Sequence, residues 1–202
     1  MRTEFVEALK TNQAAFSIEL DEPQIERLAD FYEIVLEHNP LLHLVGPCTP
    51  EEFAIRHILE SLILLNYLPN KARFADVGTG AGLPAIPCLL VREDLSAMLI
   101  DSKVRKANYL DICVKQLGLE QRAKVVNKAF NDVDLGNCVS VVCRAIDKFS
   151  ERLPRLILWR RQRQMLLFGG PNLRTALETQ PVVFSEKLIP MSEQRYLFDV
   201  NR

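Results

Sequence analysis

Ala75-Asp-Val-Gly-Thr-Gly-Ala-Gly-Leu-Pro-Ala-Ile-Pro87 is the stretch of this 202-residue sequence that decides the fold. Apolar residues typical of a strand run into Asp76, and three glycines then occupy alternate positions from Gly78 to Gly82. The apolar segment 83–91 that follows can form a helix. A strand, a glycine turn and a helix in this order can present backbone N–H groups to a nucleotide-like ligand.

The composition is that of an ordinary globular domain. Hydrophobic residues make up 48% of the chain and charged residues 25%, and the formal net charge is −1. This charge provides no global attraction to nucleic acid, so a nucleic-acid interface would need local positive charge. The five cysteines form no C-x-x-C pair, which argues against a disulfide framework or a metal site. Without a signal core or a membrane-length apolar run, we expect a cytoplasmic protein that does not contact a membrane.

Residues 1–70 predict a helical N-terminal cap. Asp21-Glu-Pro-Gln24 is a capping-box pattern with proline in the first turn. Apolar residues then recur every three or four positions from 25 to 36, and Asn39-Pro40 is expected to end this helix. Thr49-Pro-Glu-Glu52 predicts the start of another helix.

From residue 71 to 202 the pattern changes to alternating strands and helices, which predicts an α/β fold. Strands are expected at 73–77, 97–100, 124–127, 139–143 and 164–168, helices at 83–91, 103–117 and 149–158, and extended runs at 181–188 and 195–200. Such alternation predicts a mostly parallel sheet flanked by helices. The cap is then joined to this core as one compact unit.

The glycine spacing favours S-adenosyl-L-methionine over a dinucleotide as the ligand. The dinucleotide signature G-x-G-x-x-G would require a third glycine where this chain has Leu83. S-adenosyl-L-methionine has no pyrophosphate, and its amino-acid end suits a tight G-x-G-x-G loop. Asp101, about twenty residues further on, can accept hydrogen bonds from both ribose hydroxyls. A plain strand-to-helix turn with Asp101 as a helix cap, and a dinucleotide oxidoreductase, remain as alternatives.

The loop and three further stretches resemble the RsmG family, also called GidB. The stretches are Arg56-His-Ile-Leu-Glu-Ser61, Leu99-Ile-Asp-Ser-Lys-Val-Arg-Lys106 and Val142-Cys-Arg-Ala145. That family methylates N7 of a guanine in 16S ribosomal RNA. The resemblance implies a Rossmann-like, S-adenosyl-L-methionine-dependent methyltransferase with a helical N-terminal cap. It also implies action on small-subunit ribosomal RNA or the 30S particle. We expect the protein to be a monomer.

The resemblance implies roles for particular residues. Arg144 is expected to be catalytic, because it would face the reactive end of the cofactor and the target base. The residues expected to bind the cofactor are Asp76, Gly78, Thr79, Gly80, Gly82, Leu83, Asp101, Ser102, Ala129, Phe130 and Arg144. Arg56 and His57 match a stretch that faces the same cleft from the cap, so both are expected to contact RNA, with a packed helix residue as the alternative for His57. Apart from the resemblance, the basic cluster of Lys103, Arg105 and Lys106 is expected to contact RNA phosphates, with a solvated face as the alternative.

The sequence departs from the family pattern in three places. His43-Leu-Val45 replaces Asn-Leu-Thr, Phe130 replaces an acidic residue, and Phe168 replaces the lysine of Leu-Lys-Gly. These departures leave open a divergent paralogue that binds the cofactor but has another substrate or no catalytic activity.

The chemistry of guanine N7 needs few catalytic groups. N7 carries a lone pair and no proton, so methylation requires positioning rather than a general base. Arg144 can orient guanine through O6, or it can form a strand-end salt bridge with Asp76, Asp101 or Asp147. A second basic cluster around Trp159, made of Arg155, Arg160, Arg161 and Arg163, is either a phosphate-binding site or a solvated face.

Overall fold

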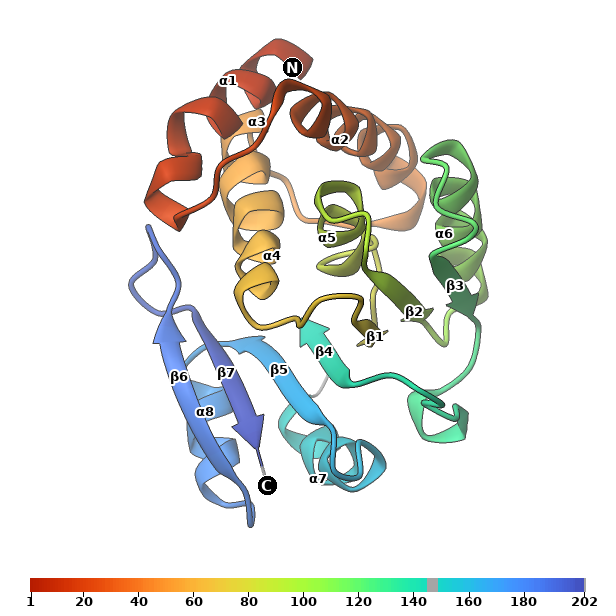
Figure 1. Ribbon diagram of the computed structural model, residues 1–202, viewed down its shortest axis with the longest axis vertical. Coiled ribbons are helices and arrows are strands. Elements are labelled where there is room, and N and C mark those ends of the chain that lie inside the picture. The colour runs from red at the N-terminus through yellow and green to blue at the C-terminus, as the bar shows by residue number, and fades with distance from the viewer. Residues whose placement is uncertain (145–148, 202) are drawn as a thin grey trace.

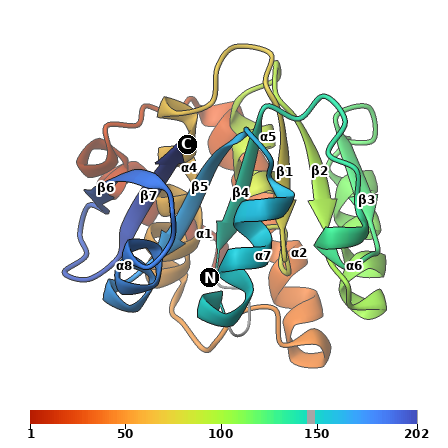
Figure 2. The ribbon, with the colours of Figure 1, turned by 90° about the horizontal axis from the view of Figure 1, so that it is seen from below.

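The computed structural model describes residues 1–144 and 149–201, so Ala145 of the Val142–Ala145 stretch and Asp147 lie outside the described residues. A seven-stranded sheet in the order β3-β2-β1-β4-β5-β7-β6 forms the centre of the molecule (Figures 1 and 2). The strands are β1 (Arg73–Val77), β2 (Ser96–Ile100), β3 (Ala123–Val126), β4 (Ser140–Arg144), β5 (Gln164–Gly169), β6 (Val183–Leu188) and β7 (Tyr196–Asn201). Strands β1 to β5 run parallel, and β7 and β6 add an antiparallel hairpin. The predicted mostly parallel sheet is confirmed.

Helices lie on both faces of this sheet, as Figure 2 shows. They are α1 (Arg2–Asn12), α2 (Glu22–Leu42), α3 (Pro50–Phe53), α4 (Glu60–Leu62), α5 (Ala85–Val91), α6 (Val104–Gln116), α7 (Phe149–Trp159) and α8 (Pro171–Glu178). Further turns are the π-helical η2 (Ala54–Leu59) and the 3-10 helices η1 (Gln13–Phe16), η3 (Ile63–Asn66) and η4 (Phe130–Asp132). No helix within the described residues is long and apolar enough to cross a membrane.

The strands build two apolar cores because successive side chains point to opposite faces of a sheet. Phe74 and Leu99 belong to the core that also contains the buried residues of α1 to α6. Their neighbours Ala75 and Ile100 belong to the core beneath α7 and α8. Strands that are buried on both faces therefore appear in the sequence as short continuous apolar runs.

The predicted N-terminal helices are present, with both capping boxes. Gln24 N donates to Asp21 Oδ1 over 2.8 Å, and Glu52 N donates to Thr49 Oγ1 over 3.1 Å. The expected end at Pro40 is wrong, because α2 continues to Leu42 and ends where His43 turns left-handed. A proline this close to the end of a 21-residue helix removes one amide hydrogen bond, which the buried face of the helix offsets.

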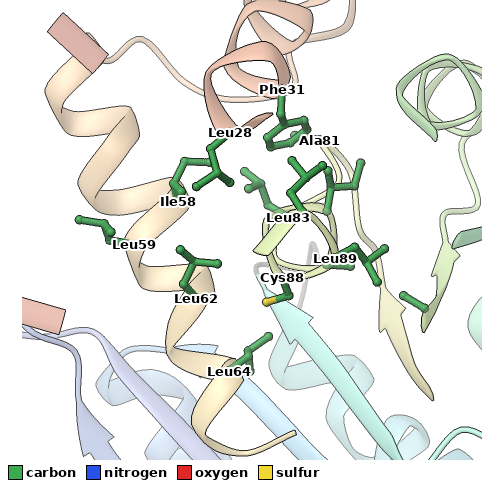
Figure 3. Close-up of a cluster of buried hydrophobic side chains, with 14 of the residues drawn as sticks. Leu28, Phe31, Ile58, Leu59, Leu62, Leu64, Ala81, Leu83, Cys88 and Leu89 are labelled. Carbon is green, nitrogen blue, oxygen red and sulfur yellow. The ribbon is translucent and has the colours of Figure 1, made fainter. Parts of the chain in front are cut away.

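The cap packs directly on the segment that follows the glycine turn. Figure 3 shows Leu28 of α2 and Ile58 of η2 side by side, in the same buried cluster as Leu83 and Leu89, and all four are at most 7% exposed. They belong to one continuous apolar cluster that also reaches the sheet. This packing supports one compact unit, while the division of the chain at residue 70 stays a prediction.

Two details differ from the expected elements. The helix after the glycine turn begins at Ala85 rather than Leu83, because the turn itself extends through Pro84. Helix α8 is absent from the expected elements, although Pro171 stands at its first position and Leu173 and Leu177 form its buried face. Eight residues with two apolar positions give a weak periodic signal.

Candidate active site

The carboxyl ends of the parallel strands place predicted site residues at one edge of the sheet. β1 leads into Gly78, β2 into Asp101 and β4 ends on Arg144, and these strands are neighbours in register. A cavity of about 370 Å3 opens at this edge. Its lining is made by Val77, Gly78, Ile100, Asp101, Ser102, Lys103, Lys106, Lys128, Ala129, Phe130, Asn131, Arg152 and Arg155. The volume lies within the range of small-molecule sites, which is about 300–1,000 Å3.

The glycine turn requires its glycines. Gly78, Gly80 and Gly82 have φ angles of 69°, 56° and 90°, in the left-handed region that side chains disfavour. A Cβ atom on Gly82 would lie 2.4 Å from Cδ1 of Ile86. The turn can therefore pack this tightly against α5 only with glycine at that position.

The amides of this turn are used within the protein. Those of residues 78 and 79 donate to Ile100 O over 2.8 and 3.2 Å, and that of residue 80 donates to Asp101 Oδ2 over 3.1 Å. The amides of residues 82 and 83 both donate to Thr79 O. These five N–H groups do not form the pyrophosphate cradle of a dinucleotide loop, so the geometry does not favour the oxidoreductase alternative.

Asp101 is placed to accept hydrogen bonds from a ribose. It is 6% exposed and lines the cavity. Its two oxygens already accept from Gly80 N and from Lys103 N, the latter over 2.9 Å. Because a carboxylate offers about four acceptor positions, about two remain for hydroxyl groups. Asp101 thus orders the start of α6, as the helix-cap alternative expects, and also faces the cavity.

Asp76 lies behind the glycine turn. It is completely buried, and its Oδ2 accepts from Thr79 Oγ1 over 2.7 Å and from Ala85 N over 3.3 Å. Its Oδ1 has no hydrogen-bond partner among the described residues. Burial raises the pKa of this carboxyl to about 8. Asp76 therefore supports the shape of the turn from inside.

The predicted cofactor residues divide into two groups. Gly78, Asp101, Ser102, Ala129 and Phe130 line the cavity. Asp76, Thr79, Gly80, Gly82, Leu83 and Arg144 are not part of that lining. The first five are brought together by the ends of β1, β2 and β3.

Phe130 closes one side of the cavity with an apolar ring. It begins η4, after β3, and is 8% exposed. Its ring meets that of Trp159 edge-on, with centroids 5.4 Å apart. An aromatic wall beside Asp101 suits the flat base of an adenosine, because bases stack well on aromatic rings.

Arg144 is held by the cap. Its Nη2 lies 3.1 Å from Oε2 of Glu60 and also donates to Arg56 O, and its Nη1 donates to Ser61 Oγ over 3.4 Å. The guanidinium carbon lies 5.7 Å from the centre of the Phe168 ring. Burial lowers the pKa of Arg144. A strand-end salt bridge of Arg144 with Asp76, Asp101 or Asp147 is the predicted alternative. Among the described residues, the ion-pair partner of Arg144 is instead Glu60.

His57 and Arg56 have different surroundings. Burial, followed by the charge of Arg144, lowers the pKa of His57 to about 3, and its Nδ1 is buried without a hydrogen-bond partner in the described part of the chain. Its ring packs edge-on against Phe53. The Arg56 side chain is 53% exposed, with Oε1 of Glu52 at 3.6 Å. Only Arg56 of this pair offers a cation to an anionic partner at neutral pH.

Basic side chains gather around the cavity from three parts of the chain. Lys103 and Lys106 belong to the start of α6, Lys128 follows β3, and Arg152 and Arg155 lie on α7. Lys128 and Arg152 are not among the predicted site residues, because only the fold brings the loop after β3 and α7 to the same opening. The predicted Arg105 is exposed but does not line the cavity.

The second basic cluster is largely structural. Arg160 is 2% exposed and donates to Val200 O and Asn201 O over 3.1 and 3.0 Å. Arg163 donates to backbone carbonyls at positions 136 and 138, and Trp159 donates through Nε1 to Val133 O. Phosphate binding by this cluster is therefore wrong for Arg160 and Arg163, whose guanidinium groups satisfy backbone carbonyls.

The sequence matches one family over most of its length. Residues 24–191 match the family GidB, described as rRNA small subunit methyltransferase G. The chain is 35% identical over 146 residues to the Ribosomal RNA small subunit methyltransferase G of Halorhodospira halophila, covering 72% of this chain and 69% of that protein. It is 36% identical over 111 residues to the protein of the same name from Chromobacterium violaceum, covering 55% of this chain and 53% of that protein. The matched stretch thus spans about half to two thirds of these curated relatives.

Solved structures support the fold. The TrmK protein of M. capricolum, solved with S-adenosyl-homocysteine, superposes with a TM-score of 0.56 at 15% identity, covering 70% of this chain and 66% of that one. The mitomycin 7-O-methyltransferase MmcR superposes with a TM-score of 0.61 at 12% identity, covering 85% of this chain and 60% of that one. At these identities the likeness shows the Rossmann-like methyltransferase fold.

Proposed function

Because this chain belongs to the GidB family, rRNA small subunit methyltransferase G, we propose that it transfers a methyl group from S-adenosyl-L-methionine to N7 of a guanine in 16S ribosomal RNA. The observation that carries the proposal is the cavity at the ends of β1 and β2, where Gly78, Asp101 and Phe130 meet. The family match supplies the reaction class, and this cavity supplies a site for the cofactor.

The residues present fit the adenosine half of S-adenosyl-L-methionine. The remaining acceptor positions of Asp101 suit the two ribose hydroxyls, and Ala129 with Phe130 suits the adenine ring. When bound, the cofactor supplies a methyl group on a positively charged sulfur. Asp76 and Thr79 then act indirectly, because they hold the turn that carries Gly78 and Gly80.

The remaining task of the protein is to orient the base. Guanine N7 is an unprotonated acceptor, so its attack needs alignment and exclusion of water rather than proton removal. A guanidinium donates well to guanine O6. We assign this role to Arg144, which stands at the end of β4, adjacent to β1.

Contacts to RNA are assigned to cations at the start of α6 and to an exposed cation of the cap. Lys103, Lys106 and Arg105 at the start of α6, together with Arg56 of the cap, would meet phosphates. Several such contacts make binding fall steeply with salt concentration. We further propose that the protein acts as a monomer in the cytoplasm, where the ribosomal RNA or the 30S particle is available.

The test is a labelling assay that maps the modified base. The protein is incubated with S-adenosyl-L-methionine carrying a labelled methyl group and with 30S particles, or their free RNA, that lack the modification. We expect label on one guanine, at N7. Label on another base, or tight cofactor binding with no label on RNA, would instead support the divergent-paralogue alternative.

A variant separates binding from transfer. Arg144→Ala should retain cofactor affinity and lower the rate of transfer, because Arg144 does not line the cavity proposed for the adenosine half. Isothermal titration calorimetry measures the affinity and the labelling assay measures the transfer. Equal loss of folding and of both activities would show that Arg144 is structural.

A further inference from the structure

A buried carboxylate connects three distant parts of the chain beside the proposed catalytic residue. Glu60 of α4 is 1% exposed. Its Oε2 lies 3.1 Å from Nη2 of Arg144 at the end of β4, and its Oε1 lies 2.6 Å from Nη2 of Arg195, just before β7. Figure 1 shows α4 between α5 and the hairpin of β6 and β7, in keeping with this three-way contact.

Stability alone gives a weak reason for this arrangement. Removing a carboxylate and two guanidinium groups from water is costly, and well-packed apolar residues often stabilise such a position equally well. Exposure rises outwards, from 1% for Glu60 to 16% for Arg144 and 38% for Arg195. The most strongly desolvated contact is therefore the one that fixes the direction of Arg144.

Among the described residues, the hydrogen-bond acceptors of Arg144 all come from the same helical stretch. Besides Glu60, these are Arg56 O and Ser61 Oγ, and Ser61 itself donates to His57 O over 2.5 Å. The stretch includes the π-helical turn η2, a widened geometry that is frequent at functional sites. Three acceptors on one rigid element set both the position and the plane of the guanidinium.

We infer that Glu60 is a positioning residue, which holds Arg144 at the angle required to orient the target base, and that Arg195 holds Glu60 in turn. This inference rests on the proposed function. Without the carboxylate, Arg144 and Arg195 would be two like charges facing one another, and repulsion would turn Arg144 away from its position.

Arg195 connects this cluster to the surface. Together with Arg56 it lines a second cleft, of about 490 Å3, between α3 and residues 191–195. Burial raises the pKa of Glu60, and the charges of Arg144 and Arg195 oppose that rise. Arg195 therefore favours the ionised carboxylate that Arg144 needs as its partner.

The central experiment is a double-mutant cycle on turnover. Glu60→Gln keeps the shape of the side chain and removes its charge. We expect kcat to fall by about 10- to 100-fold, because small displacements of an orienting group cost rates of this order. The dissociation constant of the cofactor should stay within about twofold. In an Arg144→Ala background, Glu60→Gln should cause no further loss.

Matched variants separate positioning from general damage. Glu60→Asp keeps the charge on a shorter side chain and should recover part of the lost kcat. Glu186→Gln removes the carboxylate of another close ion pair, with Arg174 at 2.6 Å, on the surface of the β6–β7 hairpin. It should leave kcat unchanged, with melting temperatures recorded for every variant.

The outcomes are distinct. Wild-type protein that labels no guanine N7 overturns the proposed function and this inference with it. Active wild type with an equally active Glu60→Gln variant overturns only the inference. Losses that multiply in the double variant likewise overturn it, since Glu60 would then act independently of Arg144. If Glu60→Gln fails to fold, the double-mutant cycle is repeated with Arg195, the more exposed partner of Glu60. The kcat of Arg195→Ala is then measured alone and in the Arg144→Ala background.

Discussion

Asp101 orders the start of α6 and also lines the cavity. Its substitution should weaken the binding of the cofactor. Asp101→Asn removes the charge and one of the acceptor oxygens that now face Gly80 N and Lys103 N. Hydrogen bonds to a charged group are worth about 1.5–3 kcal/mol, so cofactor affinity should weaken by about tenfold or more. Isothermal titration calorimetry with S-adenosyl-L-methionine measures this change.

A control for that substitution lies in an exposed loop. Asp134 Oδ1 accepts from the backbone amide of Gly136 over 3.1 Å, away from the cavity lining. Asp134→Asn should leave the affinity unchanged. Equal affinities of wild type and Asp101→Asn would remove Asp101 from the cofactor site.

Asp76 should make stability depend on pH. Burial raises its pKa from 3.8 to about 8, so the folded carboxyl keeps a proton that the unfolded chain has already released. The free energy of unfolding therefore decreases as pH rises from about 4 to 8, by about 1.4 kcal/mol per pH unit. Asp76→Asn lacks this contribution, and urea unfolding of both proteins at several pH values measures the difference. Parallel pH profiles would contradict the assignment.

His57 changes the free energy of unfolding with pH in the opposite direction, but it does not disturb the comparison of wild type with Asp76→Asn. Its pKa is lowered from 6.5 to about 3, so below pH 6.5 the unfolded chain binds a proton that the folded chain excludes. Its contribution to stability is present above pH 6.5 and is lost as pH falls towards 3. Because wild type and Asp76→Asn share His57, the difference between them isolates Asp76.

At the scale of elements, the glycine turn should tolerate no side chain at its tightest point. Gly82→Ala adds a Cβ that meets Ile86 at 2.4 Å, besides requiring a φ of 90°. The left-handed backbone costs about 1–2 kcal/mol and overpacking about 1–3 kcal/mol more. The sum is the expected loss in free energy of unfolding, measured by urea denaturation.

Gly118 provides the matched control for that prediction. It follows α6 with a φ of 66°, and a Cβ there would meet nothing within 4 Å. Gly118→Ala should therefore cost only the backbone part, about 1–2 kcal/mol. Equal losses for the two variants would show that the clash with Ile86 relaxes.

At the scale of the whole molecule, the cap and the sheet should unfold together. Leu28 of α2 is fully buried in the apolar cluster that also reaches the sheet. Leu28→Ala should lower the free energy of unfolding by about 2–5 kcal/mol. Far-UV circular dichroism follows all the helices, including those of the cap, and Trp159, the one tryptophan in the sequence, follows the other face of the sheet.

A two-state protein gives the same transition with both probes. We therefore expect Leu28→Ala to shift the fluorescence transition as far as the dichroism transition. A fluorescence transition that stays at its wild-type position would mean that the cap unfolds as a separate unit. The proposed function requires the joint behaviour, because Arg144 of the sheet depends on Glu60 and Arg56 of the cap.

The sequence by itself determined the features that depend on near neighbours along the chain. The capping boxes at Asp21 and Thr49 join residues three positions apart. The glycine turn needs only its own backbone angles, and Asp101 follows from the end of the next strand. Alternating strands and helices likewise predicted the parallel sheet, since each element is defined by its own periodicity.

Only the tertiary structure decided which distant groups meet. Glu60 and Arg195 are 135 positions apart, and nothing local indicates that one carboxylate faces two arginines. Arg160 looked like a surface cation until the fold surrounded it with backbone carbonyls. Periodicity and spacing report which face a residue occupies. Charge pairing and burial depend on long-range contacts, and those are set only when distant elements pack against one another.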